Sequence, residues 1–86
     1  MPQISVFFGI VISMFYDEHN PPHFHAQYGE HACCIDIRTL TIIQGKFPPR
    51  ALGLVIEWAT LHTKELTDNW KSVERQEPLK KIKPLQ

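Results

Sequence analysis

Residues 17–29 read Asp-Glu-His-Asn-Pro-Pro-His-Phe-His-Ala-Gln-Tyr-Gly, and they hold three of the five histidines of the 86-residue chain. The proline pair at positions 21 and 22 fixes φ twice and removes two backbone donors, so this part suits neither a helix interior nor a central strand. We predict a rigid, extended turn there. Residues 23–28 then alternate between polar and apolar side chains up to Gly29, which is the pattern of a half-buried strand.

The strand predicted at residues 23–28 places His23, His25 and Gln27 on one face. A strand rises ~3.3 Å per residue, so the Cα atoms of His23 and His25 should lie roughly 6–7 Å apart with parallel side chains. Two imidazoles in that arrangement can meet one metal ion or one phosphate. His19 lies four residues before His23, and it brings a third ring to the same point if the turn folds back.

The rest of the first half is rich in residues that favour strands. Gly9 divides its longest apolar run, either as a bulge or as the bend of a tight hairpin. Apolar runs and polar–apolar alternation mark further strands, so that strand signals lie at residues 4–16, 23–28, 31–38 and 41–44. These segments predict a small antiparallel sheet of about four strands.

The prolines at positions 48 and 49 mark a change of pattern, since proline suits the first turn of a helix. Apolar side chains recur at helical spacing from residue 50 to 62, and Leu66, Trp70 and Val73 continue that spacing until Pro78 ends it. We predict one α+β domain over residues 1–86. Its parts are a β-rich segment (1–45), a helical segment with one or two helices that cover the sheet (46–77), and an extended C-terminal tail (78–86).

The size and composition of the chain predict one modest core, because 43% of its 86 residues are hydrophobic. We expect folding without a metal or a disulfide, so a bound metal would serve function. No apolar run approaches the ~20 residues of a membrane span, and the start of the chain lacks the basic segment of a secretory signal. We therefore expect a soluble, cytoplasmic protein that does not contact membranes.

Cys33 and Cys34 are adjacent, so on a strand their side chains point to opposite faces and a bridge between them would be strained. The alternation of residues 31–38 puts Cys33 on the apolar side with Ile35 and Ile37. We predict two reduced core thiols, which fits a reducing compartment.

Charge is unevenly distributed along the chain, although the formal net charge is zero. Residues 1–45 carry one basic and four acidic residues, and residues 46–86 carry eight basic and five acidic residues. Glu74 and Glu77 interrupt the basic C-terminal part. We therefore favour a solvated surface over nucleic-acid contact, which stays an open alternative.

Lys46 and Arg50 flank the start of the predicted helix, where two cations and free backbone donors could bind an anion. The simpler interpretation is a surface arginine that pairs with Glu57 or with solvent. Both interpretations remain open.

Three interpretations of His19, His23 and His25 also remain open. As metal ligands, the rings would bind a divalent transition metal such as zinc and leave a fourth position for water. As catalytic groups without a metal, they would act as general acid and base on an RNA hydroxyl, with Lys46 or Arg50 balancing the phosphate charge. As structural groups, they would only hydrogen-bond the backbone around the prolines.

Several separated motifs carry a resemblance to a known family. They are MPxIS at residues 1–5, DxHNPPHFH at 17–25, GKxPPRAL at 45–52, EWAxxH at 57–62, NW at 69–70 and IxPL at 82–85. Over nearly its whole length the chain resembles the small bacterial proteins of the domain of unknown function 4160 family. The resemblance implies no assigned activity. It implies a gene often placed beside that of a second small protein, as in a toxin–antitoxin module.

From the resemblance and the tail we predict an interaction component of such a two-gene module. It would bind a small protein encoded nearby, through the tail and an exposed sheet edge. The alternative is a small metal-dependent or histidine-driven nuclease or hydrolase with its site at His19, His23 and His25. A homodimer through an uncovered strand edge is also compatible with the sequence. The residues leave open whether the protein is an enzyme.

Overall fold

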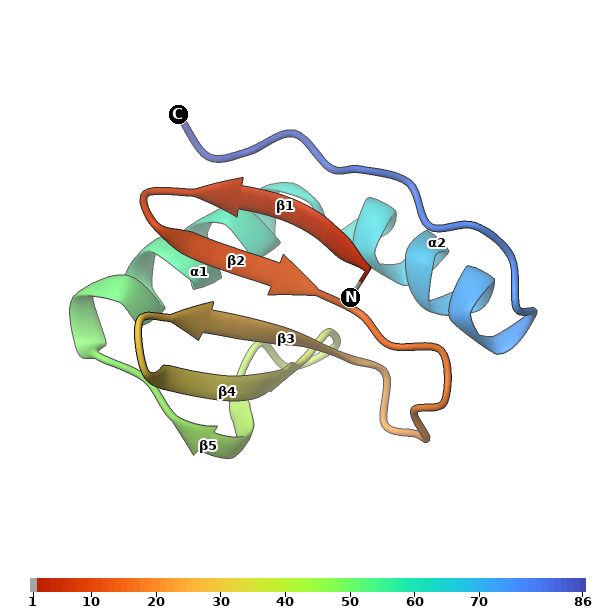
Figure 1. Cartoon of the computed structure of the whole chain (residues 1–86), viewed down its shortest axis with the longest axis horizontal. Coiled ribbons are helices and arrows are strands. Elements are labelled where there is room, and N and C mark those ends of the chain that lie inside the picture. Colours follow the sequence, from red (N-terminus) through yellow and green to blue (C-terminus); the bar gives the residue numbers. More distant parts are fainter. Residues whose placement is uncertain (1) are drawn as a thin grey trace.

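The computed structural model describes residues 2–86 of the chain. Five strands come first and two helices follow, so the domain is α+β, as the sequence predicted. The elements are β1 (Gln3–Phe7), β2 (Ile10–Ser13), β3 (His23–Tyr28), β4 (His31–Asp36), β5 (Ile42–Lys46), α1 (Pro49–Leu61) and α2 (Thr63–Glu74). Figure 1 shows the strands side by side, with the helices behind them and an extended tail after α2.

The five strands form one antiparallel sheet in the order β1-β2-β3-β4-β5. The sequence predicted about four strands, and the additional one arises at Gly9. Its φ of +78° is a left-handed conformation that glycine adopts without steric cost. Phe7 pairs with Ile10 across this bend, so Gly9 forms a hairpin turn and the apolar run makes two strands.

A second tight turn sets the register between β3 and β4. It contains Gly29, whose φ is +58°. The register that results pairs His25 with Cys34 and His23 with Asp36 across the two strands. Because paired residues of neighbouring strands point to the same side of a sheet, these four side chains share one face.

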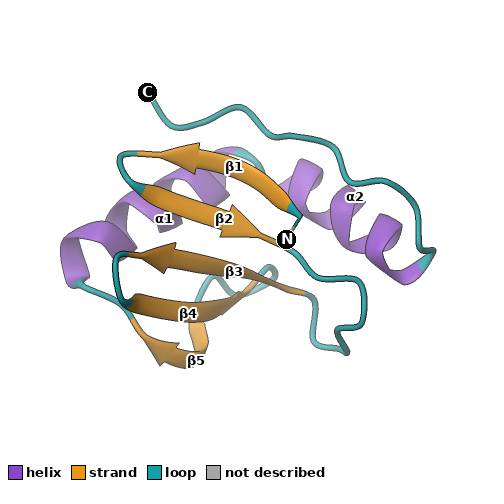
Figure 2. Cartoon of the chain, viewed as in Figure 1, coloured by secondary structure: helices purple, strands orange, loops and turns teal. Residues whose placement is uncertain are grey.

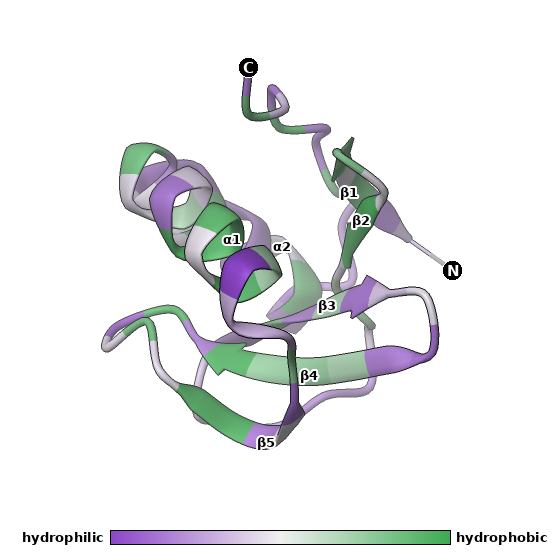
Figure 3. Ribbon diagram, turned by 90° about the vertical axis from the view of Figure 1, so that its left-hand side faces the viewer, coloured by the Kyte–Doolittle hydropathy of each residue, from purple (hydrophilic) through white to green (hydrophobic). Residues whose placement is uncertain are grey.

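The other face of the sheet is covered by the two helices and forms the core (Figure 3). Trp58 of α1 is fully buried, and its ring lies 5.4 Å from Phe7 and 5.9 Å from Phe24, measured between centroids. Leu66 and Trp70 are buried on the side of α2 that faces the core. Within residues 2–86, neither helix is long and apolar enough to cross a membrane.

The C-terminal tail docks on its own domain (Figure 2). The backbone N–H of Ile82 donates to the carbonyl of Ile4 in β1 at 2.7 Å, and Ile82 is 4% exposed. The indole N–H of Trp58 donates to the carbonyl of Lys83 at 2.9 Å. The extended tail that the sequence predicted therefore lies against its own domain. The tail thereby covers the outer edge of β1, and among the described residues no strand pairs with the outer edge of β5.

Candidate metal centre

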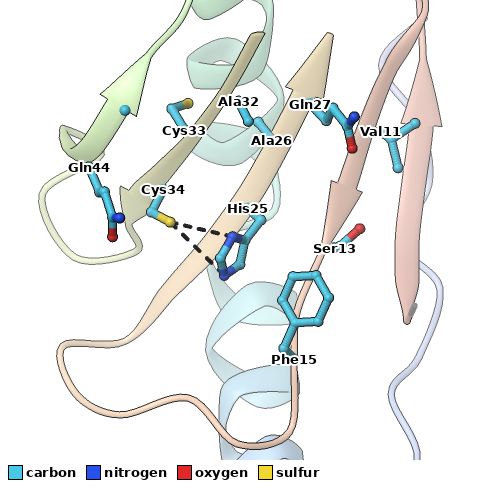
Figure 4. Close-up of a pocket in the computed structure, with 11 residues that line it drawn as sticks. Val11, Ser13, Phe15, His25, Ala26, Gln27, Ala32, Cys33, Cys34 and Gln44 are labelled. Atoms are coloured by element: carbon cyan, nitrogen blue, oxygen red, sulfur yellow. Dashed lines mark hydrogen bonds between the residues drawn. The ribbon is translucent and has the colours of Figure 1, made fainter. Parts of the chain in front are cut away.

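His23, His25 and Cys34 converge on the face of the sheet that the helices leave open. One potential ligand atom from each of them lies within 4.8 Å of the other two. The Nδ1 atom of His25 is 3.4 Å from the sulfur of Cys34, and the rings of His23 and His25 are 5.3 Å apart. The residues come from neighbouring strands, so the sheet register itself assembles the cluster (Figure 4). These two imidazoles and one thiol could hold a metal ion.

Glu18 adds a carboxylate to the cluster from the loop between β2 and β3. Its Oε1 atom is 2.5 Å from Nε2 of His25, and its Oε2 atom is 3.6 Å from Nε2 of His23. The two oxygens therefore face two different imidazoles. A carboxylate in this position can act as a fourth ligand or can hydrogen-bond a ligand.

The tautomer of His23 follows from its second nitrogen. Nδ1 lies 2.7 Å from the carbonyl oxygen of Pro21, so Nδ1 carries a proton and donates it in a hydrogen bond. In the neutral ring, Nε2 then presents a lone pair towards Glu18. A ring whose Nδ1–H is fixed by a backbone carbonyl while Nε2 is free matches the usual arrangement of a metal-binding histidine.

Aromatic packing holds both rings in place. His23 is 8% exposed and lies 5.3 Å from the ring of Trp70, while Phe15 meets His25 edge-on at 4.6 Å. The side chain of His25 remains 29% exposed. The cluster is therefore rigid on its inner side and accessible on its outer side.

A depression of about 300 Å³ lies next to the cluster on the open face of the sheet. His25 and Cys34 form part of its wall, and Figure 4 shows them pointing towards each other beside Phe15. The remaining polar side chains of the wall are Ser13, Gln27 and Gln44. A small ligand in this space would touch the exposed side of the cluster.

The two cysteines differ in environment and in acidity. Burial raises the pKa of Cys34, and the neighbouring Glu18 carboxylate raises it further. Burial, followed by the charge of Cys34, raises the pKa of Cys33 to about 11. Cys33 is a core thiol, as predicted. Cys34 is half-buried on the open face beside His25, so its prediction as a core thiol was wrong.

A sequence profile described as "Domain of unknown function (DUF4160)" matches residues 9–71. The chain belongs to the DUF4160 family. The match includes His23, His25 and Cys34 of the cluster and the loop that carries Glu18. No curated protein and no solved structure matches the chain.

The DUF4160 chain brings together two of the three histidines selected from the sequence. His19 is exposed and is not part of the cluster. The loop does fold back, but it delivers the neighbouring Glu18 instead. Sequence reasoning missed both Glu18 and Cys34. The tight turn at Gly29 was the available signal for Cys34, since a two-residue turn after Tyr28 places position 25 opposite position 34.

Lys46 and Arg50, the candidate anion-binding pair, lie at the junction of β5 and α1. Lys46 is the last residue of β5, and Arg50 is the second residue of α1. Both are exposed, and within residues 2–86 neither side chain makes a hydrogen bond or an ion pair, including with Glu57. Anion binding at this pair stays a prediction.

Proposed function

We propose that this DUF4160 chain binds a divalent transition metal such as zinc at His23, His25 and Cys34, and that the ion serves a hydrolytic reaction in the adjoining depression. The observation that carries the proposal is the convergence of two nitrogen ligands and one sulfur ligand within 4.8 Å. Imidazole and thiolate are the ligands that zinc accepts most readily in proteins.

The setting of the cluster favours a functional metal over a structural one. The hydrophobic core of the domain lies mainly on the opposite face of the sheet, and of the three residues only His23 packs against it, through Trp70, so folding has its own source of stability. Three protein ligands leave a fourth position for water, and a bound zinc ion lowers the pKa of such a water towards ~7. Glu18 is placed either to take that fourth position or to act as the general base.

The test begins with elemental analysis of protein purified without a polyhistidine tag, followed by titration with zinc, nickel, copper and manganese. We expect near-stoichiometric metal in the wild type and none in His23→Ala/His25→Ala or in Cys34→Ser. His19→Ala is the matched control, because His19 lies in the same loop region but outside the cluster. Wild-type protein that neither contains nor takes up metal would contradict the proposal and would leave acid–base or bracing roles for the histidines.

Glu18→Gln separates the two roles of the carboxylate, because it keeps the size of the side chain and removes the charge. Metal loss in this variant would identify Glu18 as a ligand. Retained metal with loss of hydrolysis of phosphodiester or ester substrates would identify it as the base. Retained metal with unchanged hydrolysis would exclude both roles.

A second candidate function is that of an interaction component in a toxin–antitoxin-like two-gene module in the cytoplasm. The observation in its favour is the outer edge of β5, which no strand of residues 2–86 covers and where Ile43 is 45% exposed. An open edge of this kind can accept a strand of a small protein partner or of a second copy of the chain. The tail is not proposed as the docking element, because it is bound to β1.

The edge hypothesis is tested with Ile43→Lys, since a lysine on an edge strand opposes further strand pairing. Light scattering would show whether the wild type dimerises, and co-expression with the product of a neighbouring gene would show whether a complex forms. We expect at least one of these assemblies in the wild type and its loss in the variant. A monomeric wild type that forms no complex would contradict this candidate.

A further inference from the structure

A groove of about 400 Å³ lies between α2 and the C-terminal tail, remote in sequence from the candidate metal centre. Four basic side chains line it. Lys71 lies in the last turn of α2 and Arg75 directly follows the helix, while Lys80 and Lys81 come from the tail. Positive charge therefore stands on both walls. We call this feature the α2–tail groove.

The acidic residues of the α2–tail groove do not neutralise these four cations. Glu65 accepts a hydrogen bond from Nδ1 of His62 at 2.6 Å, and Asp68 pairs with Lys64 at 3.1 Å. Both carboxylates are thus engaged by cationic or donor groups that are not part of the groove lining.

The four basic side chains, in contrast, make no ion pair and no side-chain hydrogen bond within residues 2–86. Glu74 and Glu77 interrupt the basic run in the sequence, but neither of them lines the groove. The folded groove therefore carries an excess of positive charge, although acidic residues alternate with the basic ones in the sequence.

The tail wall of the groove is fixed in place. The side chain of Asn69 donates to the carbonyl of Lys80 at 2.9 Å and accepts from its backbone N–H at 3.0 Å. Asn69 is 3% exposed, so these two hydrogen bonds are protected from water. A ligand would meet preformed walls, which reduces the entropy lost on binding.

We propose that the α2–tail groove binds the phosphate backbone of single-stranded nucleic acid without reading its sequence. Lysine and arginine donors suit phosphate oxygens, and Lys71 and Arg75 lie one helical turn apart, at a rise of about 6 Å. The lining has no aromatic side chain, so binding would rest on phosphate contacts alone, without the base stacking that single-strand binders commonly add. Its only apolar member, Ile82, is 4% exposed, so an acidic peptide would find no apolar contact for its side chains.

The proposal does not depend on the candidate metal centre, and the experiment keeps the two apart. Fluorescence anisotropy would follow binding of a labelled single-stranded RNA of about 12 nucleotides, which is within the site sizes of known single-strand binders. Binding would be measured with and without a chelator, between about 50 and 200 mM salt. We expect chelation to have no effect. With four phosphate contacts, log K should fall with log salt at a slope of about −2.8.

Lys71→Gln/Arg75→Gln removes two of the four charges and keeps a good helix former at position 71 of α2. It should weaken binding about tenfold or more and reduce the slope by about 1.4. Arg38→Gln/Lys83→Gln is the control, because it also removes one arginine and one lysine, neither of which lines the groove. The control should bind within about twofold of the wild type.

Three results would overturn the proposal. They are a wild type that fails to bind at low salt, an equal loss of affinity in both double variants, and displacement of the RNA by polyglutamate as effectively as by unlabelled RNA. The last result would identify an acidic polypeptide as the ligand. Circular dichroism of each variant would confirm that it is folded, and Lys80→Gln/Lys81→Gln on the opposite wall should reproduce the loss.

Discussion

Cys33 and Cys34 are neighbours of the same residue type, yet they belong to opposite regions of the molecule. Cys33 is 3% exposed and packs in the core under the helices, whereas Cys34 faces the depression beside His25. The same division runs along β3, where Phe24 is fully buried and the flanking histidines point the other way. A side-chain period of two thus assigns stability to one face of the sheet and chemistry to the other.

The first prediction, which has the largest expected effect, removes a side chain from the core and compares the result with a substitution on the open face. Phe24→Ala should lower the free energy of unfolding by about 3–5 kcal/mol, because the ring is fully buried against Trp58 and its removal leaves a cavity. His25→Ala, one residue along β3, should cost less than about 1 kcal/mol, since that side chain is part-exposed. Urea unfolding of both variants measures the difference. Equal losses would show that the open face also carries stability.

The second prediction uses the two cysteines as a matched pair. Cys33→Ser places a hydroxyl in the core and should destabilise the fold by about 1–3 kcal/mol. Cys34→Ser should change stability by no more than about 0.5 kcal/mol, because its side chain borders solvent. Only the second variant should lose metal. Thermal unfolding and metal titration of the two proteins check both halves, and metal loss in Cys33→Ser with its fold intact would contradict the assignment.

The side-chain period of two also explains which features of the fold could be predicted from the sequence alone. The alternation at residues 23–28 predicted the strand and the shared face of His23 and His25, and the glycines and prolines predicted the turns and the start of α1. The number of strands depended on whether Gly9 formed a bulge or the bend of a hairpin. The presence of a glycine is compatible with both, and only the observed backbone conformation distinguishes them. Proline placement around residue 49 was sufficient for the order of sheet and helices.

The candidate site was less predictable, because its members meet through pairing and loop path. Cys34 joins His25 across two strands, and only the exact register, fixed by the turn at Gly29, makes that contact. Glu18 joins them because the loop after β2 turns one carboxylate inwards and leaves His19 outside. No local sequence pattern shows that Glu18, and not the adjacent His19, would point into the cluster. The basic groove likewise requires the tail to lie beside α2, which Asn69 ensures.

The third prediction concerns the pH dependence of metal binding at the open face. Burial and Glu18 raise the pKa of Cys34, so the thiol must lose a proton when an ion binds. At pH values below that pKa, metal affinity should therefore rise about tenfold, or about 1.4 kcal/mol, for each unit by which the pH increases. Titrations at a series of pH values in two buffers measure the proton release. Any weak binding that Cys34→Ser retains at high metal concentration should show a flatter pH dependence, and an identical slope in both proteins would exclude the thiolate as a ligand.

The fourth and smallest effect lies at Asp36, where the open face meets the turn after β4. Burial would raise the pKa of this carboxyl, but hydrogen bonds from Arg38 and from the backbone N–H of Thr39, together with the Arg38 charge, outweigh burial and lower it. A folded-state pKa below the unfolded value of about 3.9 contributes stability above that value, and the contribution is lost as the pH falls through the folded pKa.

Asp36→Asn isolates this contribution, because the amide oxygen of asparagine can still accept the bond that Oδ1 receives from the N–H of Arg38 at 2.7 Å, while the charge is gone. Urea unfolding would be compared at neutral pH and near pH 2.5. The wild type should lose more stability than the variant on acidification, since only the wild type protonates a carboxylate there. Equal losses would mean that the turn is held by its hydrogen bonds without help from the charge.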